Sequence, residues 1–320
     1  MTVNRHKNAS WLSVFKNKTF EYVRTSRLSA WMTAAVFFLL GEWHSYEAMP
    51  FYQSIIALIA LGGILSSTSW INFVFDKELD SFAGQDVSFF KHISPREMLL
   101  LSGIISIISL ALLFFLGHLL FSVGLLILIV GILYSAPPLR LKIHPPLDSI
   151  ANALEFGTLP LLLGFVSANN FSLDSTLFVL LIVSGLIVIS YYLIIDILDL
   201  ETDKKYGVKT SVTILGLNKS INVSLVLYFF SLILSIVFFG VFSPISSSLI
   251  VSTPIILIVK IKNDRNSIAK ILSSISLVWT EVVLLYIFVL SRSIIPLAIS
   301  VLVFLSAFYF IYVYVTMVKK

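Results

Sequence analysis

The sequence predicts an all-α fold, a polytopic membrane bundle of nine to ten transmembrane helices. Of the 320 residues, 58% are apolar and only 12% are charged, and the mean hydropathy is +0.98. Soluble domains carry about 25% charged residues, so this composition excludes an ordinary soluble fold. Apolar stretches close to the roughly 20 residues that a helix needs to cross a bilayer recur along the whole chain.

Ten such stretches define the expected helices. They cover residues 28–46, 53–75, 97–117, 119–136, 148–167, 173–198, 219–241, 243–261, 268–291 and 293–317. The connections at Gly117 and at Ser291 to Ser293 would be very tight turns, so the count is nine or ten. We expect residues 1–27 to form a cytoplasmic N-terminal tail and residues 28–320 to form a single transmembrane domain.

The distribution of basic residues predicts the orientation. With the N-terminus inside, all of the 22 Lys and Arg residues except Arg292 fall in inner segments. The positive-inside rule then places the tail and both acidic motifs on the cytoplasmic side, in a protein of the cell membrane. The net charge of +5 belongs to that face, and no nucleic-acid partner is predicted. The chain has no cysteine, which excludes disulfides and thiolate chemistry.

Two acidic clusters lie where the second and sixth apolar stretches end. The first, NFVFDKELD, contains Asn72, Asp76 and Asp80, and the second, DILDLETD, contains Asp196, Asp199 and Asp203. Helical spacing would place the acids of each cluster side by side, where like charges destabilise a helix unless a cation compensates them. Carboxylate and amide oxygens suit Mg²⁺, so we predict that these six residues bind it. The alternative is a pair of solvated helix ends neutralised by nearby lysines.

A third polar segment, YSAPPLRLKIHPPLDS, runs from Tyr134 to Ser149 in the loop after the fourth expected helix. Its Arg140 and Lys142 could bind the oxygens of an anion held by metal at the acidic clusters, such as a leaving diphosphate. Equally, the segment could be a stiff proline-rich turn whose cations only set the topology. The similar design of the two acidic loops also suggests a partial internal repeat around a central cavity.

The motifs NxxxDxxxD, YSxPPxRxK and DxxDxxxDxxxGxxT together resemble the UbiA superfamily of intramembrane polyprenyl transferases, over roughly residues 25–220. This resemblance implies a bundle of about nine helices with a lipid-open central cavity, capped by the two Asp loops. It also implies Mg²⁺ as cofactor, held on a prenyl diphosphate by Asn72, Asp76, Asp80, Asp199 and Asp203. Asp196 matches an additional acid of archaeal-type members.

The resemblance also implies roles for individual residues. Asp76, Asp199 and Tyr134 would be catalytic, and Arg140, Lys142 and Lys205 would bind diphosphate. Many members have a basic diphosphate contact in the interval after the first motif, whereas this chain reads GQDVSFFKHIS, so Lys91 is the candidate replacement there.

The implied reaction transfers a prenyl group from an allylic polyprenyl diphosphate to a lipophilic acceptor within the membrane and releases pyrophosphate. The stretch PPLRLKIHPPLDSIAN is similar to lycopene elongase-like members, whereas DILDLETD and ISPRE resemble the archaeal glycerolipid and quinone branches. The acceptor class therefore stays open among carotenoid, glycerolipid and quinone precursor. Competing readings are a transporter for a lipid or an ion-coupled solute, and a non-catalytic isoprenoid-binding member.

Further side chains inside or beside the apolar stretches could serve such a site. Aromatic faces stabilise carbocations, and those near the motifs are Trp70, Phe73, Tyr134, Tyr191 and Tyr192. Ordinary packing or interfacial anchoring is the alternative for each of them. Two intramembrane acids, Glu155 and Glu281, are costly to bury and could be functional, and Glu155 could steer an acceptor hydroxyl. A hydrogen-bonded role in helix packing explains both acids equally well.

Overall fold

The computed structural model describes residues 18–45, 50–82, 86–167, 174–262 and 283. Every regular element within these ranges is helical, which confirms the predicted all-α class. The α-helices are α2 (Leu28–His44), α3 (Phe51–Phe82), α4 (Pro95–Leu116), α5 (His118–Ser135), α6 (Leu147–Ala153), α7 (Leu159–Phe165), α8 (Ser175–Ile195), α9 (Leu200–Tyr206), α10 (Ser211–Phe239) and α11 (Pro244–Lys262). Four short segments join them: the 3₁₀ turns η1 (Ser88–Lys91), η2 (Leu141–Ile143) and η4 (Asp196–Leu198), and the π-helical η3 (Leu154–Thr158).

Five of the described helices are long and apolar enough to cross a membrane. They cover Tyr52–Phe82, Pro95–Leu116, His118–Ser135, Ser175–Leu198 and Ser211–Phe239. The predicted tight turn at Gly117 is confirmed, because α4 ends at Leu116 and α5 begins at His118. The expected helices over 268–291 and 293–317 lie outside the described residues apart from Val283, so the count of nine or ten stays a prediction.

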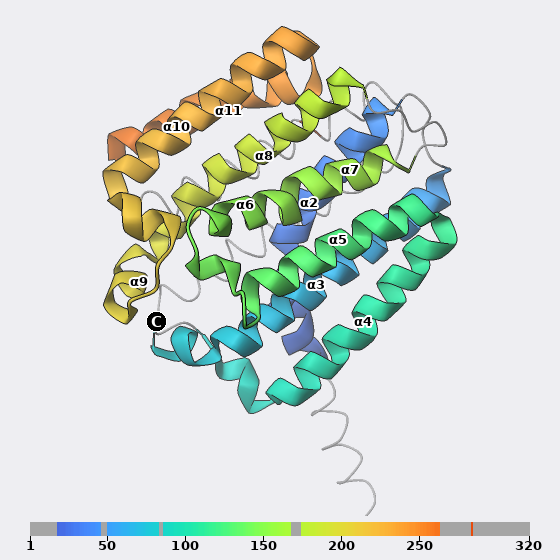
Figure 1. Cartoon of the computed structure of the whole chain (residues 1–320), viewed down its shortest axis with the longest axis vertical. Helices are drawn as coiled ribbons and strands as arrows, with labels where there is room; N and C mark the ends of the chain where they lie inside the picture. Colours follow the sequence, from blue (N-terminus) through green and yellow to red (C-terminus); the bar gives the residue numbers. More distant parts are fainter. Residues whose placement is uncertain (1–17, 46–49, 83–85, 168–173, 263–282, 284–320) are drawn as a thin grey trace, which may run out of the picture.

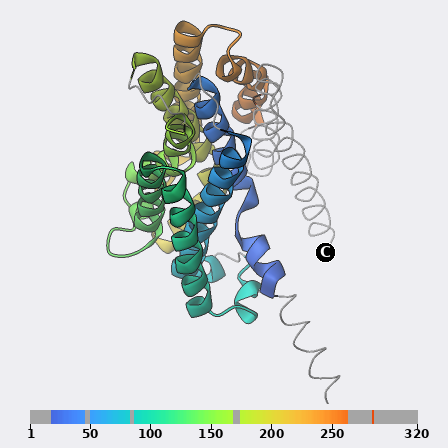
Figure 2. The ribbon, with the colours of Figure 1, turned by 90° about the vertical axis from the view of Figure 1, so that its right-hand side faces the viewer.

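The helices form two groups around a central seam (Figure 1). On one side α3 packs against α4 and α5, and on the other α8 packs against α10, which also contacts α11. Helices α2, α6 and α7 lie between these groups, and Figure 2 shows that most of the described helices run along the long direction of the molecule. Helices α3, α5, α6 and α8 border the region between the two groups, and each contributes residues to the cavity described below.

The outer surface is that of a membrane protein. Helix α4 exposes Leu100, Ile107 and Phe115, while its buried face consists mainly of small serines such as Ser106 and Ser109. Apolar side chains outside and small residues at helix contacts are the pattern expected where lipid replaces water as solvent. With the five apolar spans, this surface identifies an integral membrane protein.

Helices α2 and α7 touch through their backbones. A Cβ atom placed on Gly41 would lie 2.0 Å from the Leu161 carbonyl oxygen, and one placed on Gly164 would lie 1.8 Å from the Phe38 carbonyl oxygen. Both distances are far below a van der Waals contact. Glycine at both positions therefore permits this close crossing, as small residues do in other membrane helix pairs.

Part of the predicted N-terminal tail packs on the bundle. Residues 18–25 are helical, with Lys18 Nζ 2.7 Å from Glu97 and Arg24 Nη1 2.5 Å from Asp86. Hydrogen bonds from Ser88 and the ion pair with Arg24 lower the pKa of Asp86 to about 2. This end of the chain is thereby fixed beside the segment that follows the first acidic motif.

Candidate active site

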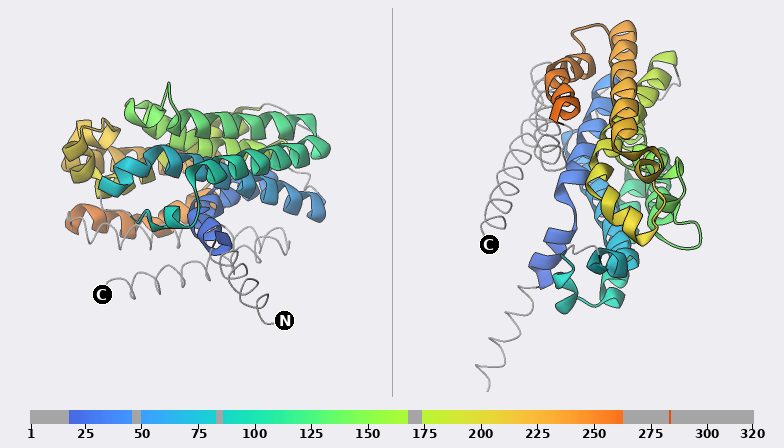
Figure 3. Two further views of the ribbon diagram at one scale, coloured as in Figure 1. Left: turned by 90° about the horizontal axis from the view of Figure 1, so that it is seen from below. Right: turned by 90° about the vertical axis from the view of Figure 1, so that its left-hand side faces the viewer.

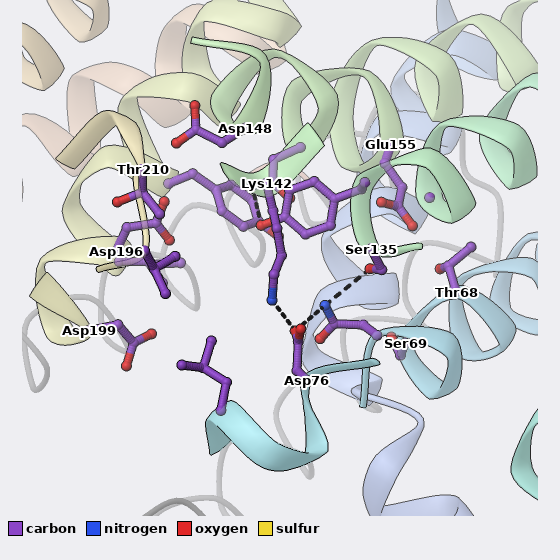
Figure 4. A pocket seen from close by; sticks show the side chains of 18 of the residues that line it. Thr68, Ser69, Asp76, Ser135, Lys142, Asp148, Glu155, Asp196, Asp199 and Thr210 are labelled. Carbon is purple, nitrogen blue, oxygen red and sulfur yellow. Dashed lines mark hydrogen bonds and ion pairs between the residues drawn. The ribbon is translucent and has the colours of Figure 1, made fainter. Parts of the chain in front are cut away.

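A cavity of about 310 Å³ lies at the end of the seam where both acidic motifs are found (Figure 4). Its walls come from the starts of α2, α6 and α10, from α3 and α5, and from the segment that joins α8 to α9. The lining residues are Arg27, Thr68, Ser69, Asn72, Asp76, Leu79, Asp80, Gly131, Tyr134, Ser135, Lys142, Asp148, Asn152, Glu155, Phe156, Tyr192, Ile195, Asp196, Asp199, Thr202, Asp203, Val208 and Thr210. All six predicted Mg²⁺ ligands are among them.

The first acidic motif lies on one continuous helix, as expected. Helix α3 runs unbroken through Asn72, Asp76 and Asp80, so their side chains share the face that lines the cavity. The Asn72 amide nitrogen donates to Asp76 Oδ2 at 2.8 Å and to Ser135 Oγ at 3.1 Å, and Arg27 donates to Asn72 Oδ1 at 3.0 Å. Asn72 is therefore a fixed link between the motif, α5 and Arg27.

Two cations neutralise Asp76. Arg140 Nη2 donates to Asp76 Oδ1 at 2.9 Å, and Lys142 Nζ forms an ion pair with Asp76 Oδ2 (Figure 4). Asp76 is only 4% exposed, so this charge would be costly without its partners. Burial lowers the pKa of Lys142, while Asp76 opposes that shift. The structure thus brings Arg140 and Lys142 to the first motif, although Arg140 is not among the residues that line the cavity.

The second acidic motif differs from the expectation of one helical face. Helix α8 ends at Ile195, the 3₁₀ turn η4 begins at Asp196, and Asp199 starts the new helix α9. This break turns the chain between the first two acids, yet Asp196, Asp199 and Asp203 all still line the cavity. Burial, and then the neighbouring Asp199, raise the pKa of Asp203 to about 6. The carboxylates on this side therefore crowd one another.

The segments that follow the two motifs meet across the mouth of the cavity. Tyr206 donates a hydrogen bond of 2.8 Å to the Phe82 carbonyl, and the two rings stack with centroids 5.8 Å apart. The right-hand view of Figure 3 shows α9, in yellow, beside the cyan end of α3. This contact holds the second motif opposite the first.

The third polar segment begins and ends within helices, which agrees with the expected helices over 119–136 and 148–167. Tyr134 belongs to the last turn of α5, and α6 already begins at Leu147. Tyr134 lines the cavity, and its hydroxyl accepts a hydrogen bond of 3.4 Å from Asn152. The intervening η2 turn carries Lys142 to Asp76.

Other predicted residues divide between the cavity and its surroundings. Tyr192 lines the cavity, and its ring stacks on Phe156 with centroids 5.7 Å apart. Trp70, Phe73 and Tyr191 are not among the lining residues, and Trp70 and Phe73 pack in a separate apolar cluster.

The structure does not bring Lys91 or Lys205 to the cavity lining. Lys91 is exposed at the end of η1, and Lys205 lies over the Tyr206 ring, with its Nζ 5.3 Å from the ring centroid. Arg27 is a lining cation that the sequence reasoning placed only in the N-terminal tail. Its position directly before the first apolar stretch was the available signal.

The donor set suits a hard cation, although the ligands have not converged. Among the described residues, no three acidic or histidine side chains surround one point closely enough to hold a metal ion by themselves. Asp80, Asp199 and Asp203 nevertheless line the same cavity from two walls, and their oxygens are ligands that Mg²⁺ prefers. Because Mg²⁺ commonly completes its shell with water and substrate phosphate oxygens, this arrangement fits Mg²⁺ bound together with a diphosphate.

An integral membrane helical bundle whose cavity combines two acidic motifs with Arg27 and the partly buried Lys142 defines a class of membrane enzyme that handles anionic substrates. Sequence comparison identifies the family: the model of the UbiA prenyltransferase family matches residues 29–272, and the chain belongs to that family. It is a polyprenyl transferase, as the three motifs indicated. No curated protein matches the sequence.

Solved structures share the fold. A UbiA homolog from Archaeoglobus fulgidus bound to DMAPP and Mg²⁺ is 21% identical with a TM-score of 0.65, over 82% of this chain and 99% of that chain. A UbiA homolog from Aeropyrum pernix K1 is 18% identical with a TM-score of 0.67, over 81% and 98%. A digeranylgeranylglyceryl phosphate synthase is 19% identical with a TM-score of 0.62, over 84% and 97%. At these identities the likeness establishes the architecture of the bundle.

Proposed function

We propose that this protein transfers a prenyl group from an allylic polyprenyl diphosphate to a lipophilic acceptor inside the membrane, in a reaction that depends on Mg²⁺. The observation that carries the proposal is the single cavity in which both acidic motifs face Lys142 and Arg27. Two structures of a UbiA homolog from Archaeoglobus fulgidus with this fold hold DMAPP or GPP together with Mg²⁺, which supports an allylic diphosphate as the donor class.

The acids of the two motifs would hold the metal. Asp76, Asp80, Asp199 and Asp203, with Asn72 and Asp196 beside them, offer oxygen ligands from facing walls of the cavity. Mg²⁺ bound there would supply the positive charge that a departing diphosphate requires.

The basic side chains bind and orient the diphosphate. Lys142 and Arg140 already hold Asp76, and a diphosphate entering between the motifs presents additional oxygens to the same cations. Arg27 approaches from the start of α2, through its bond to Asn72. These donors are positioned before the reaction, so they stabilise the charge that develops on the leaving group without reorganising.

The aromatic walls serve the other half of the donor. When the allylic C–O bond breaks, positive charge develops on the prenyl carbon, and the ring faces of Tyr134, Phe156 and Tyr192 line the adjacent part of the cavity. Aromatic faces attract cations, and these rings also exclude the water that would turn the cation into an alcohol. We assign Tyr134 this stabilising role.

The same proposal extends to the arrangement in the membrane. The basic segments around the motifs support a position of this end of the bundle on the cytoplasmic side of the cell membrane, with residues 1–27 as a cytoplasmic tail and residues 28–320 as one domain. Lipid access to the cavity from the bilayer would admit both substrates.

Mass spectrometry of lipid extracts tests the function. Cells supplied with C5 to C20 allylic diphosphates would express the native chain, the double variant Asp76→Asn with Asp199→Asn, or a matched double variant Glu78→Gln with Glu201→Gln. Glu78 and Glu201 lie on the same helices but are exposed and do not line the cavity.

A new lipid, heavier by one prenyl unit, should form with the native chain and the matched variant and should be absent with the Asp variant. Formation of the same lipid by the Asp variant would overturn the assignment of the site. Purified protein that binds the diphosphate with Mg²⁺ but never releases pyrophosphate would instead indicate a non-catalytic isoprenoid-binding member.

A further inference from the structure

Glu155 is a buried acid at the end of the cavity away from the acidic motifs. It lies on the π-helical segment η3, which interrupts the path from α6 to α7, and its side chain is 3% exposed yet lines the cavity (Figure 4). Single π-helical turns inside helices occur frequently at functional sites, because they redirect one side chain. Here the redirected side chain is an acid.

Helix α3 gives the distance between Glu155 and the diphosphate end, which is the end of the cavity where Asp76 and its cations lie. The Glu155 and Thr68 side chains lie beside each other at Gly131, and Thr68 lies eight residues before Asp76 on the same face of α3. At about 1.5 Å of rise per residue this is about 12 Å along the helix. A prenyl carbon attached to a diphosphate at Asp76 would therefore lie between the two ends, with the acceptor on the Glu155 side.

Glycine at position 131 makes room for this carboxyl group. A Cβ atom placed on Gly131 would lie 2.5 Å from Glu155 Oε1 and 2.4 Å from Thr68 Cγ2. The face of α5 that meets Glu155 is therefore kept free of any side chain.

No cation neutralises Glu155 within the described part of the chain. None of the ion pairs found there includes it, and the hydroxyl of the neighbouring Thr68 donates to the Leu65 carbonyl, 3.0 Å away. Arg27, a cation with an electrostatic effect on Glu155, donates to Asn72 and lies over the Phe73 ring. Helix packing alone does not require such an acid, since intramembrane carboxyl groups are costly unless they serve a function.

The transfer reaction needs a base at this end. The allylic C–O bond breaks and its electron pair leaves with the diphosphate, and the prenyl carbon then forms a bond with an oxygen or carbon atom of the acceptor. The acceptor must lose one proton to restore neutrality. The positive charge that develops beside Glu155 also favours the ionised form of its carboxyl group, which can accept this proton.

We infer that Glu155 is the catalytic base that takes the proton from the acceptor, and that the acceptor is uncharged at its reacting end. This inference rests on the proposed function. A carboxylate that faces the acceptor repels a carboxylated or phosphorylated group, and the cations of the cavity gather at the diphosphate end instead. The acceptor class is therefore a neutral lipid that reacts through a hydroxyl group or a carbon–carbon double bond.

The test of the acceptor class uses native protein in lipid nanodiscs with Mg²⁺ and labelled geranyl diphosphate. A total lipid extract, separated by anion exchange into neutral and anionic pools, supplies the acceptor. The label should appear in a lipid of the neutral pool, at least about tenfold more than in the anionic pool. Equal labelling of both pools, or labelling of the anionic pool alone, would overturn the inference.

The test of Glu155 compares Glu155→Gln with Glu42→Gln. Glu42 is the matched control because it is also a buried acid in the bundle, at 8% exposure, and does not line the cavity. Glu155→Gln should lower transfer about 100-fold, within the range typical of a lost general base, while geranyl thiolodiphosphate still binds with Mg²⁺ at native affinity. The released prenyl group should then be recovered as prenyl alcohol, so the ratio of alcohol to prenylated lipid rises at least about tenfold.

The outcomes separate this inference from the proposed function. Native transfer rates in Glu155→Gln, or a parallel loss of donor binding and transfer, would overturn the role of Glu155 while leaving the transferase in place. Native protein that neither releases pyrophosphate nor labels either pool would refute the proposed function, and the inference with it. If Glu155→Gln does not fold, Gly131→Ala provides the same comparison, because it displaces the carboxyl group without removing it.

Discussion

The two acidic motifs line one cavity, but they differ in backbone structure and in the ion pairs of their carboxylates. The first lies on the unbroken α3, where Asp76 is bound to Arg140, Lys142 and Asn72. The second lies across the 3₁₀ turn η4, and neither Asp196 nor Asp203 takes part in any ion pair found among the described residues.

This difference in ion pairing explains how such a site can be stable before its ligands bind. The first motif is neutralised internally, so it can be buried in a rigid helix at little electrostatic cost. In the second motif the carboxylates repel one another, as the effect of Asp199 on the pKa of Asp203 indicates, and the 3₁₀ turn η4 separates α8 from α9. A cation that enters the cavity is therefore drawn first to the second motif, whereas the diphosphate is drawn to the cations of the first.

The largest effect expected is that of Asp76→Asn. Removing this carboxylate should lower kcat/KM for prenyl transfer by about 10³-fold, since it takes away a proposed metal ligand and the partner of two cations. It should also lower the free energy of unfolding by about 3 kcal/mol, because Lys142 loses its partner while remaining buried. Steady-state kinetics and thermal unfolding in detergent check both values. An unchanged stability would contradict the conclusion that the first motif is neutralised internally.

Replacing Lys142 tests the role of its positive charge separately from the role of the Asp76 carboxylate. Lys142→Met should weaken binding of a non-reactive prenyl diphosphate by about 10- to 100-fold, because one charge-assisted contact is lost. Binding of Mg²⁺ alone should strengthen, since Mg²⁺ then no longer competes with Lys142 for the Asp76 carboxylate. Titration calorimetry with each ligand separately measures this, and a parallel weakening of both ligands would contradict the division of roles.

The second motif should respond in the opposite direction to the first. Asp203→Asn should raise the melting temperature of metal-free protein in EDTA at pH 8 by about 1–2 °C, because it relieves the repulsion from Asp199. The same change should reduce the stabilisation that Mg²⁺ with diphosphate provides to the native protein. Glu201→Gln, a change at an exposed position two residues away, is the control and should leave both melting temperatures unchanged. A lower melting temperature in Asp203→Asn would show that the second motif is neutralised as well.

The smallest effect concerns the contact that joins the motifs. Tyr206→Phe keeps the stacked ring but removes the hydrogen bond to the Phe82 carbonyl, and a bond of this kind contributes about 1 kcal/mol. We expect the KM for the allylic diphosphate to rise about fivefold, with kcat nearly unchanged. Tyr206→Leu, which also loses the ring contact, should raise it further. Identical kinetics in all three proteins would mean that the motifs do not depend on this contact.

The sequence predicted the parts of the site that depend on spacing along one helix. Continuous apolar stretches gave the described spans, and the four-residue spacing of Asn72, Asp76 and Asp80 predicted their shared face correctly. Spacing on the same helix is a local property, so no knowledge of packing was needed.

The parts that the sequence did not predict depend on breaks and on contacts between distant segments. The turn at Asp196 interrupts a stretch with helical composition, because Asp199 begins a new helix beside α10. Arg27 reaches Asn72 across 45 residues of chain. Lys91 and Lys205 have the right charge and lie near the motifs in sequence, but both are exposed and neither lines the cavity.

The glycine crossing of α2 and α7 has a consequence for how this protein can vary. At Gly41 and Gly164 even a methyl group would meet a carbonyl oxygen, so selection or a mutational library should return glycine almost alone there. The outward face of α4 exposes Leu100 and Phe115 and should accept most apolar residues. In a deep mutational scan, intolerance to any larger side chain at Gly41 and Gly164 would therefore mark a backbone contact that belongs to neither acidic motif.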